Sequence, residues 1–120
     1  MTRGLAAKRR AERSGRWAEW AAVALLLVKG YRLAARRFRT PVGELDLVMR
    51  KARLLVFVEV KFRADPEGQP FVLGPRQQER LKRAAGLYIA AHPSFAGWTQ
   101  RFDLVIITRR SLPKHMKNAW

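Results

Sequence analysis

The stretch LLVFVEVKF at residues 54–62 decides the fold of this chain. It consists mainly of β-branched, aromatic and other apolar residues, a composition that is typical of a buried strand. Glu59 and Lys61 interrupt it two positions apart, so their side chains leave the same face of the strand. The opposite face is expected to point into the core, and it carries Val56, Val58 and Val60.

The run just before this stretch predicts its partner strand. Residues 44–50 alternate between two faces. One expected face carries Leu45, Leu47 and Met49, and the other carries Glu44, Asp46 and Val48. Residues 51–53 form a short connection, so the two runs are expected to pair as an antiparallel hairpin. Such a hairpin would bring Asp46 close to Glu59 and Lys61, on one face of the sheet.

Further helices and strands are expected on either side of this hairpin. Ser14 is expected to cap a helix that ends near Val28, and Pro75 to begin a second helix that ends near Ala91. The remaining expected segments are strands at residues 31–38 and 101–108, a turn at residues 40–43 and a polar loop at residues 65–74.

These elements predict one α/β domain, a mixed sheet flanked by helices in the order α-β-β-β-α-β. The domain is expected to span residues 14–108. A flexible basic arm at residues 1–13 is expected to precede it, and a loose basic C-terminal tail at residues 109–120 to follow it.

Both helices show apolar spacing that predicts a buried face. For the first helix the expected face is Trp17, Trp20, Ala21, Ala24, Leu25 and Val28, widened by Leu26 and Leu27. The two tryptophans are therefore interpreted as core residues and not as surfaces on which bases stack. For the second helix the expected face is Leu81, Ala84, Ala85, Tyr88 and Ile89.

The charge of the chain points to a polyanionic partner. Lys and Arg number 25 against nine Asp and Glu, which gives a net charge of +16 and a pI near 11.7. Nucleic acid is the common partner of such a domain, an anionic membrane surface is the less common one, and a merely solvated basic surface is the third interpretation. The uncharged run at residues 20–28 is far shorter than the ~20 residues that span a bilayer, so a cytoplasmic protein without a membrane partner is predicted.

The charged residues of the hairpin suggest a specific chemistry. Two carboxylates that meet at one point form a hard-oxygen site suited to Mg²⁺ or Mn²⁺. A neighbouring lysine can contact a phosphate, and together these groups would offset the charge that develops during phosphodiester hydrolysis. The alternative is a structural ion pair in which Lys61 neutralises Glu59. The chain has no cysteine, and His92 and His115 lack a companion at zinc-ligand spacing.

Three motifs resemble the YraN family of small uncharacterised bacterial proteins. They are GELDL at residues 43–47, FVEVKxR at residues 57–63 and RFDLV at residues 101–105. That family looks like a branch of the restriction-endonuclease-like PD-(D/E)XK fold and is similar to archaeal Holliday junction resolvases. The resemblance implies that Asp46 and Glu59 bind Mg²⁺ and that Lys61 is the catalytic lysine.

The resemblance extends to three other positions. Glu19 matches a glutamate that nucleases of this fold place on the first helix, and Gln78 matches a helix glutamine that touches their site; both are candidate catalytic residues. The family usually has glycine and lysine where this chain has Ala18 and Gln77. Asp103 is interpreted as structural, as a residue that caps or pairs with an arginine.

Three functions remain open at this point. The first is a Mg²⁺-dependent endonuclease acting on structured or branched DNA, with DNA favoured over RNA and a homodimer considered by analogy with resolvases. The second is a non-catalytic nucleic-acid-binding protein of the same fold, and the third is a basic adaptor for an acidic surface. The residues expected to contact the phosphate backbone are Arg32, Arg36, Arg37, Arg39, Arg63, Arg76, Arg80 and Arg83.

Overall fold

The computed structural model describes residues 2–63, 73–109 and 111–120, with side chains from residue 15 onward. Most of the polar loop expected at residues 65–74 lies outside the described residues. In chain order the elements are α1 (Thr2–Val28), β1 (Arg32–Thr40), β2 (Gly43–Lys51), β3 (Leu54–Arg63), α2 (Pro75–Ala91), the 3₁₀ turn η1 (Pro93–Phe95), β4 (Thr99–Thr108) and β5 (Lys114–Met116).

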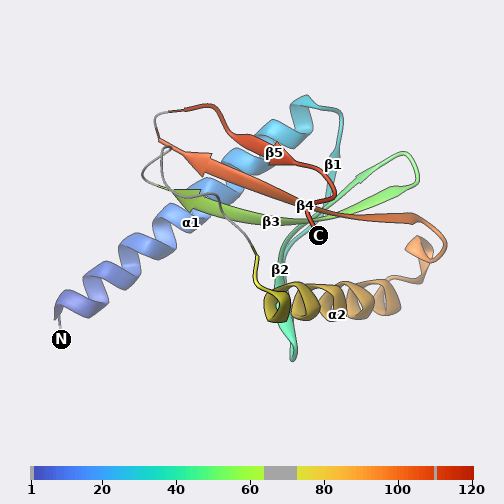
Figure 1. The fold of residues 1–120 in the computed structure, drawn as a ribbon, viewed down its shortest axis with the longest axis horizontal. Helices are drawn as coiled ribbons and strands as arrows, with labels where there is room; N and C mark the ends of the chain where they lie inside the picture. The colour runs from blue at the N-terminus through green and yellow to red at the C-terminus, as the bar shows by residue number, and fades with distance from the viewer. Residues whose placement is uncertain (1, 64–72, 110) are drawn as a thin grey trace.

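The five strands form one mixed sheet in the order β1-β2-β3-β4-β5 (Figure 1). The expected hairpin of β2 and β3 is present, with Leu47 opposite Val58 and Lys51 opposite Leu54. β3 and β4 run parallel, because α2 carries the chain back across the sheet between them. The prediction of a small α/β domain with a mixed sheet is confirmed.

Each face of the sheet is covered by one helix, and a separate apolar core lies under each. The core beneath α1 includes Ala18, Ala22, Leu26, Tyr31, Leu47, Met49, Val56, Val58 and Val105. The core beneath α2 includes Leu45, Val48, Leu55, Phe57, Leu81, Ala84, Ala85 and Tyr88, with Ile89 packed against it. The prediction that Val56, Val58 and Val60 point into the core is thus confirmed, although Val60 is only partly buried. The predicted buried face of α2 is confirmed as well.

The first helix differs from its prediction in where it begins. α1 starts at Thr2, so residues 2–13 continue the helix that was expected to begin at Ser14. Residues 5–13 are Leu, Ala, Lys, Arg and Glu, which all have high helix propensity, and Gly15 is tolerated within the helix at a modest cost. Among the described residues, no helix is both long enough and apolar enough to cross a bilayer.

The buried face of α1 is also different from the expected one. Ala18, Ala22 and Leu26 are at most 1% exposed, whereas Trp17 and Trp20 are 50% and 52% exposed. The interpretation of the two tryptophans as core residues is therefore wrong. Apolar residues surround most of this helix, so spacing alone does not select one face.

The residues after β4 do not form a loose tail throughout. β5 pairs antiparallel with β4, with His115 opposite Val105. The sequence does not indicate this strand, because Lys114–Met116 is short and polar and lacks apolar alternation.

The β1–β2 hairpin departs from regular alternation on both of its strands. Arg37 has a φ of 55°, which side chains other than glycine rarely adopt. Leu47 packs beneath α1, while Phe38 and Leu45 pack on the α2 side. The expectation that Leu45 shares a face with Leu47 is therefore wrong, because strict alternation assumes an unbroken extended backbone.

Candidate functional site

Asp46 lies where β2 and β3 stop pairing. The last paired residues are Leu47 and Val58, and beyond them the backbone N–H of Val60 donates a 2.9 Å hydrogen bond to Oδ2 of Asp46. The carboxylate of Asp46 thus accepts the hydrogen bond that a backbone carbonyl of β2 would accept in a regular sheet. This contact holds the carboxylate against β3, next to Glu59.

Asp46 and Glu59 are neighbours, and each carboxyl group influences the pKa of the other. Glu59 is only 7% exposed, and both residues line one open cavity of about 550 Å³ between the hairpin and the start of α2. The other residues that line this cavity are Gly43, Glu44, Gly74, Arg76, Gln77, Arg80 and Leu81. The topology therefore brings the two expected carboxylates together on one accessible surface.

The electrostatics of this pair favour an added positive charge. The pKa of Glu59 is raised to about 8, mainly by burial and then by the charge of the neighbouring Asp46, while Lys61 opposes the shift. Burial also raises the pKa of Asp46, against the hydrogen bonds from Val60 and Glu59. Two neighbouring carboxylates that are largely shielded from water cannot both ionise without cost, so the pair retains a proton unless a cation replaces it.

Lys61 completes the expected group. Its Nζ atom lies 3.3 Å from Oε1 of Glu59, and its side chain is 31% exposed. The Lys61–Glu59 ion pair that the purely structural interpretation predicts is therefore present. The Lys61 side chain also remains partly exposed to solvent.

Glu19 approaches the pair from α1, on the other side of the sheet. It is 9% exposed, and its Oε1 accepts a 2.7 Å hydrogen bond from Nε of Arg37 and lies 3.4 Å from Nη1 of Arg36. Its charge contributes to the raised pKa of Asp46, so the two residues are near each other. The spacing of residues in the sequence did not predict that two consecutive arginines contact the same carboxylate. The left-handed backbone at Arg37 accompanies this arrangement.

Gln78 does not line the cavity that contains Asp46 and Glu59. Its Nε2 donates a 2.8 Å hydrogen bond to the backbone oxygen of Leu73, and its backbone N–H donates to Gly74 at the start of α2. Gln77 lines the cavity instead, and the sequence pattern did not single it out as a site residue.

The arginines expected to bind phosphate fall into separate groups. Arg76 and Arg80 line the cavity beside Asp46 and Glu59, and a second cavity of about 650 Å³ continues from Arg80 to Arg39 and Arg83. Arg39 lies 4.0 Å from Glu44, and Arg83 lies 3.7 Å from Glu79.

The other expected phosphate contacts lie elsewhere. Arg32 lines a third cavity with Arg50 and Lys51. Arg63 ends β3, two positions beyond Lys61.

The two carboxylates fit a divalent cation only if other ligands complete the site. Among residues 15–63, 73–109 and 111–120, no three His, Cys, Asp or Glu side chains are grouped closely enough to hold a metal ion. Mg²⁺ usually takes one or two carboxylates and keeps several waters or phosphate oxygens. The Asp46–Glu59 pair satisfies that smaller requirement.

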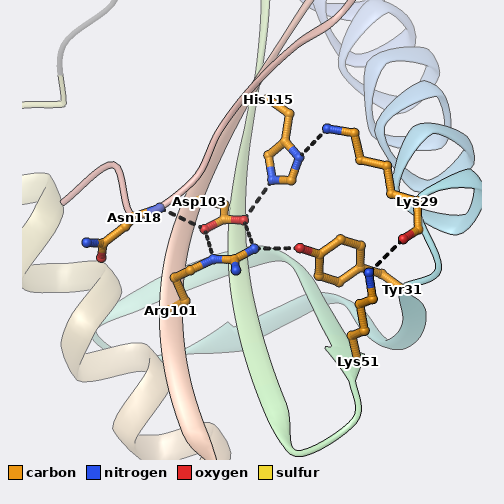
Figure 2. Close-up of polar contacts among 7 residues, drawn as sticks. All are labelled: Lys29, Tyr31, Lys51, Arg101, Asp103, His115 and Asn118. Atoms are coloured by element: carbon orange, nitrogen blue, oxygen red, sulfur yellow. Dashed lines mark hydrogen bonds and ion pairs between the residues drawn. The ribbon is translucent and has the colours of Figure 1, made fainter.

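Asp103 belongs to a different polar network on β4 (Figure 2). It is fully buried and pairs through both oxygens with Arg101, at 2.8 Å and 2.7 Å. His115 and the backbone N–H of Asn118 contact the same carboxylate. The interpretation of Asp103 as a residue that pairs with an arginine is confirmed.

Comparison with known proteins identifies the relatives of this chain. Residues 18–107 match the uncharacterised protein family UPF0102. The chain belongs to this family. The YraN-like resemblance is thereby confirmed.

Several UPF0102 proteins are similar to the chain over most of their length. One from Rhodopseudomonas palustris (strain BisB18) is 50% identical over 108 residues, which are 90% of this chain and 80% of the relative. One from Maricaulis maris (strain MCS10) is 47% identical over 120 residues, which are 100% of this chain and 92% of the relative. The segment matched to UPF0102 contains Glu19, Asp46, Glu59 and Lys61, but not His115.

Proposed function

We propose that this UPF0102 protein is a divalent-cation-dependent endonuclease that hydrolyses phosphodiester bonds in structured or branched DNA. The observation that carries the proposal is that Asp46 and Glu59 line one cavity together with Arg76 and Arg80, with the Nζ atom of Lys61 3.3 Å from Glu59. The motif residues match those of PD-(D/E)XK nucleases, in which the strand carboxylates bind the metal.

The charges of the cavity support a phosphate-binding role. Two carboxylates beside a nucleic-acid backbone would repel it unless a cation intervened. Bound Mg²⁺ supplies positive charge at the carboxylate pair and so lets a phosphate lie against it. Arg76 and Arg80 bind the backbone on either side, which orients the strand along the cavity.

The contact of Lys61 with Glu59 supports its role as the catalytic lysine in this proposal. A cation held by Asp46 and Glu59 would share the negative charge of Glu59 and leave the Lys61 ammonium group able to contact a phosphate. The ammonium group then donates hydrogen bonds to a non-bridging phosphate oxygen and stabilises the charge that grows there as water attacks phosphorus and one ester bond breaks.

A specific observation favours the second candidate, a non-catalytic nucleic-acid-binding protein. Glu59 is already paired with Lys61, and Glu19 with Arg37, so each of these two carboxylates has a counter-charge without a metal. This alternative predicts salt-sensitive DNA binding that does not respond to Mg²⁺.

The experiment incubates the purified protein with Mg²⁺ and with four-way, flapped and linear DNA. Cleavage is expected for the native protein and is expected to be lost in Asp46→Asn, Glu59→Gln and Lys61→Met. Glu79→Gln is the matched control, because Glu79 is an exposed carboxylate on α2 that pairs only with Arg83 in the described structure. Cleavage that persists in the Asp46 and Glu59 variants would come from a contaminating nuclease and would contradict the proposal.

A second readout does not depend on activity. Titration of the native protein with Mn²⁺ near neutral pH is expected to release a proton, because the cation replaces the proton held by the carboxylate pair. Glu59→Gln should bind Mn²⁺ more weakly and release no proton. Absence of both Mn²⁺ binding and cleavage in the native protein would leave the binding protein as the function.

A further inference from the structure

Two tryptophans of α1 lie on the protein surface, where large aromatic residues are uncommon. Trp17 is 50% exposed and Trp20 is 52% exposed. They are three positions apart, so they are neighbours on the outward side of the helix. Exposed aromatic residues that lie together mark a surface used for binding.

Both rings are held in place by neighbouring side chains. The guanidinium group of Arg36 lies over the Trp20 ring at 4.3 Å from its centroid. The Trp17 ring meets Phe62 of β3 at right angles, with ring centroids 6.0 Å apart. Because these contacts orient the indoles before any ligand binds, little ordering cost remains for a ring that stacks on them.

Positively charged arginine side chains lie next to the aromatic rings of this surface. Arg36 covers part of Trp20, Arg109 lies 5.6 Å from the Phe62 ring, and Arg16 precedes Trp17 on the exposed side of α1. The one acidic residue of the segment 15–28 is Glu19, which points inward. Aromatic rings interleaved with positive charge suit an anionic ligand that also has flat apolar faces.

This surface adjoins the ion pairs of Glu19 through Arg36. Arg36 contacts both Trp20 and Glu19, and the charge of Glu19 reaches Asp46. A strand bound on α1 would therefore lie beside the ion pairs of Glu19, while the cavity of Asp46 and Glu59 opens on the α2 side of the sheet.

We propose that Trp17 and Trp20 form a stacking surface for unpaired bases, so that the substrate class is nucleic acid with a single-stranded segment, such as a flap or an open junction. The inference rests on the proposed function for its link to hydrolysis. In a continuous duplex the faces of each base are covered by the neighbouring bases of the stack, so only unpaired bases can stack on the two indoles. Every base has such a face, and binding is therefore independent of sequence.

The test measures binding of the full chain in EDTA, which separates binding from cleavage. Fluorescence anisotropy follows a labelled thymidine oligonucleotide of about 15 nucleotides, long enough for one binding site, and a blunt duplex of equal length. Trp17→Ala and Trp20→Ala are each expected to weaken binding of the single strand about five- to a hundredfold, and to change duplex binding less than about twofold.

Two further variants make the test specific to aromatic stacking. Leu27→Ala is the matched control, because Leu27 is also 50% exposed on α1 but offers no ring, and it should bind the single strand as the native protein does. Trp20→Tyr should restore most of the affinity that Trp20→Ala loses. Equal melting temperatures of the variants show that the fold is intact.

Several outcomes would overturn the inference. One is an unchanged single-strand affinity in both alanine variants, and another is an equal loss for single strand and duplex. A third is a native dimer that dissociates in the alanine variants while single-strand binding persists, which would assign the surface to a second copy of the chain.

If the protein binds nucleic acid but is not an endonuclease, the experiments give a different result. If Glu59→Gln and the native protein bind the single strand equally in EDTA, and neither cuts DNA in Mg²⁺, the stacking surface stands and the endonuclease does not.

Discussion

Nε2 of His115 lies 2.7 Å from Oδ2 of Asp103, and this contact ties the short strand β5 to a fully buried carboxylate on β4 (Figure 2). Arg101 and the backbone of Asn118 satisfy the remaining capacity of the same carboxylate, and Arg101 also donates to the hydroxyl of Tyr31. The network therefore joins the C-terminal residues, β4 and the core beneath α1.

Replacement of Asp103 by alanine is expected to destabilise the protein by about 3–5 kcal/mol, the cost typical of breaking a buried ion pair. The loss leaves Arg101 and His115 without their acceptor. Urea denaturation measures the change. The exposed pair of Glu79 and Arg83 is the control, since Glu79→Ala should change stability by about 1 kcal/mol or less. Equal effects of the two variants would contradict the structural role of Asp103.

The titration of His115 provides a second prediction. Burial lowers the pKa of His115 below its ordinary value of 6.5, Lys29 adds to this shift, and Asp103 opposes it. The neutral imidazole is thus favoured in the folded state. Its contribution to stability is full above pH 6.5 and falls as the pH drops through the folded pKa. The chain has only two histidines, so NMR titration of the native protein and of His92→Gln identifies the His115 curve. A midpoint above 6.5 would contradict the prediction.

Stability of the metal-free protein is expected to depend on pH through Glu59. Its pKa is raised from the ordinary 4.5 to about 8, so the folded state holds a proton that the unfolded chain releases. The contribution of Glu59 to the free energy of unfolding is full below pH 4.5 and is lost as the pH rises through about 8. Urea denaturation in EDTA well above pH 6.5 keeps the contribution of His115 small. Glu59→Gln should remove most of this slope, and a native protein with no slope would contradict the pKa.

Two adjacent leucines test which face of α1 is buried. Leu26 is fully buried and Leu27 is 50% exposed. Leu26→Ala is expected to cost about 2–5 kcal/mol because it opens a cavity in the core beneath α1. Leu27→Ala should cost about 1 kcal/mol or less, since it removes surface that is already half in water. Chemical denaturation of the two variants measures both values, and a larger loss for Leu27 would place the opposite face in the core.

The sequence predicted the hairpin and the second helix well because their signals are local. Alternation and β-branched residues marked residues 54–62, and Pro75 marked the first residue of α2. Asp46, Glu59 and Lys61 could be grouped in advance, since an antiparallel hairpin leaves few ways to arrange them. The roles of these three residues remain predictions.

The faces of α1, strand β5 and the surroundings of Glu19 could not be predicted in the same way. α1 is apolar on most sides, and only the position of the sheet decides that Ala22 is buried and Trp20 is exposed. His115 meets Asp103 from 12 positions away, and Arg37 reaches Glu19 from 18 positions away. Such contacts have no local pattern.

The amino-acid sequence by itself therefore determined the strands β1 to β4, the second helix, the family and the presence of two carboxylates on one hairpin. Only the tertiary structure decided that those carboxylates line one cavity beside arginines, and that two tryptophans face the solvent. The physical reason is that propensity and periodicity act between neighbours in the chain. Burial and pKa, in contrast, depend on which distant segments pack against a residue and remove water from it.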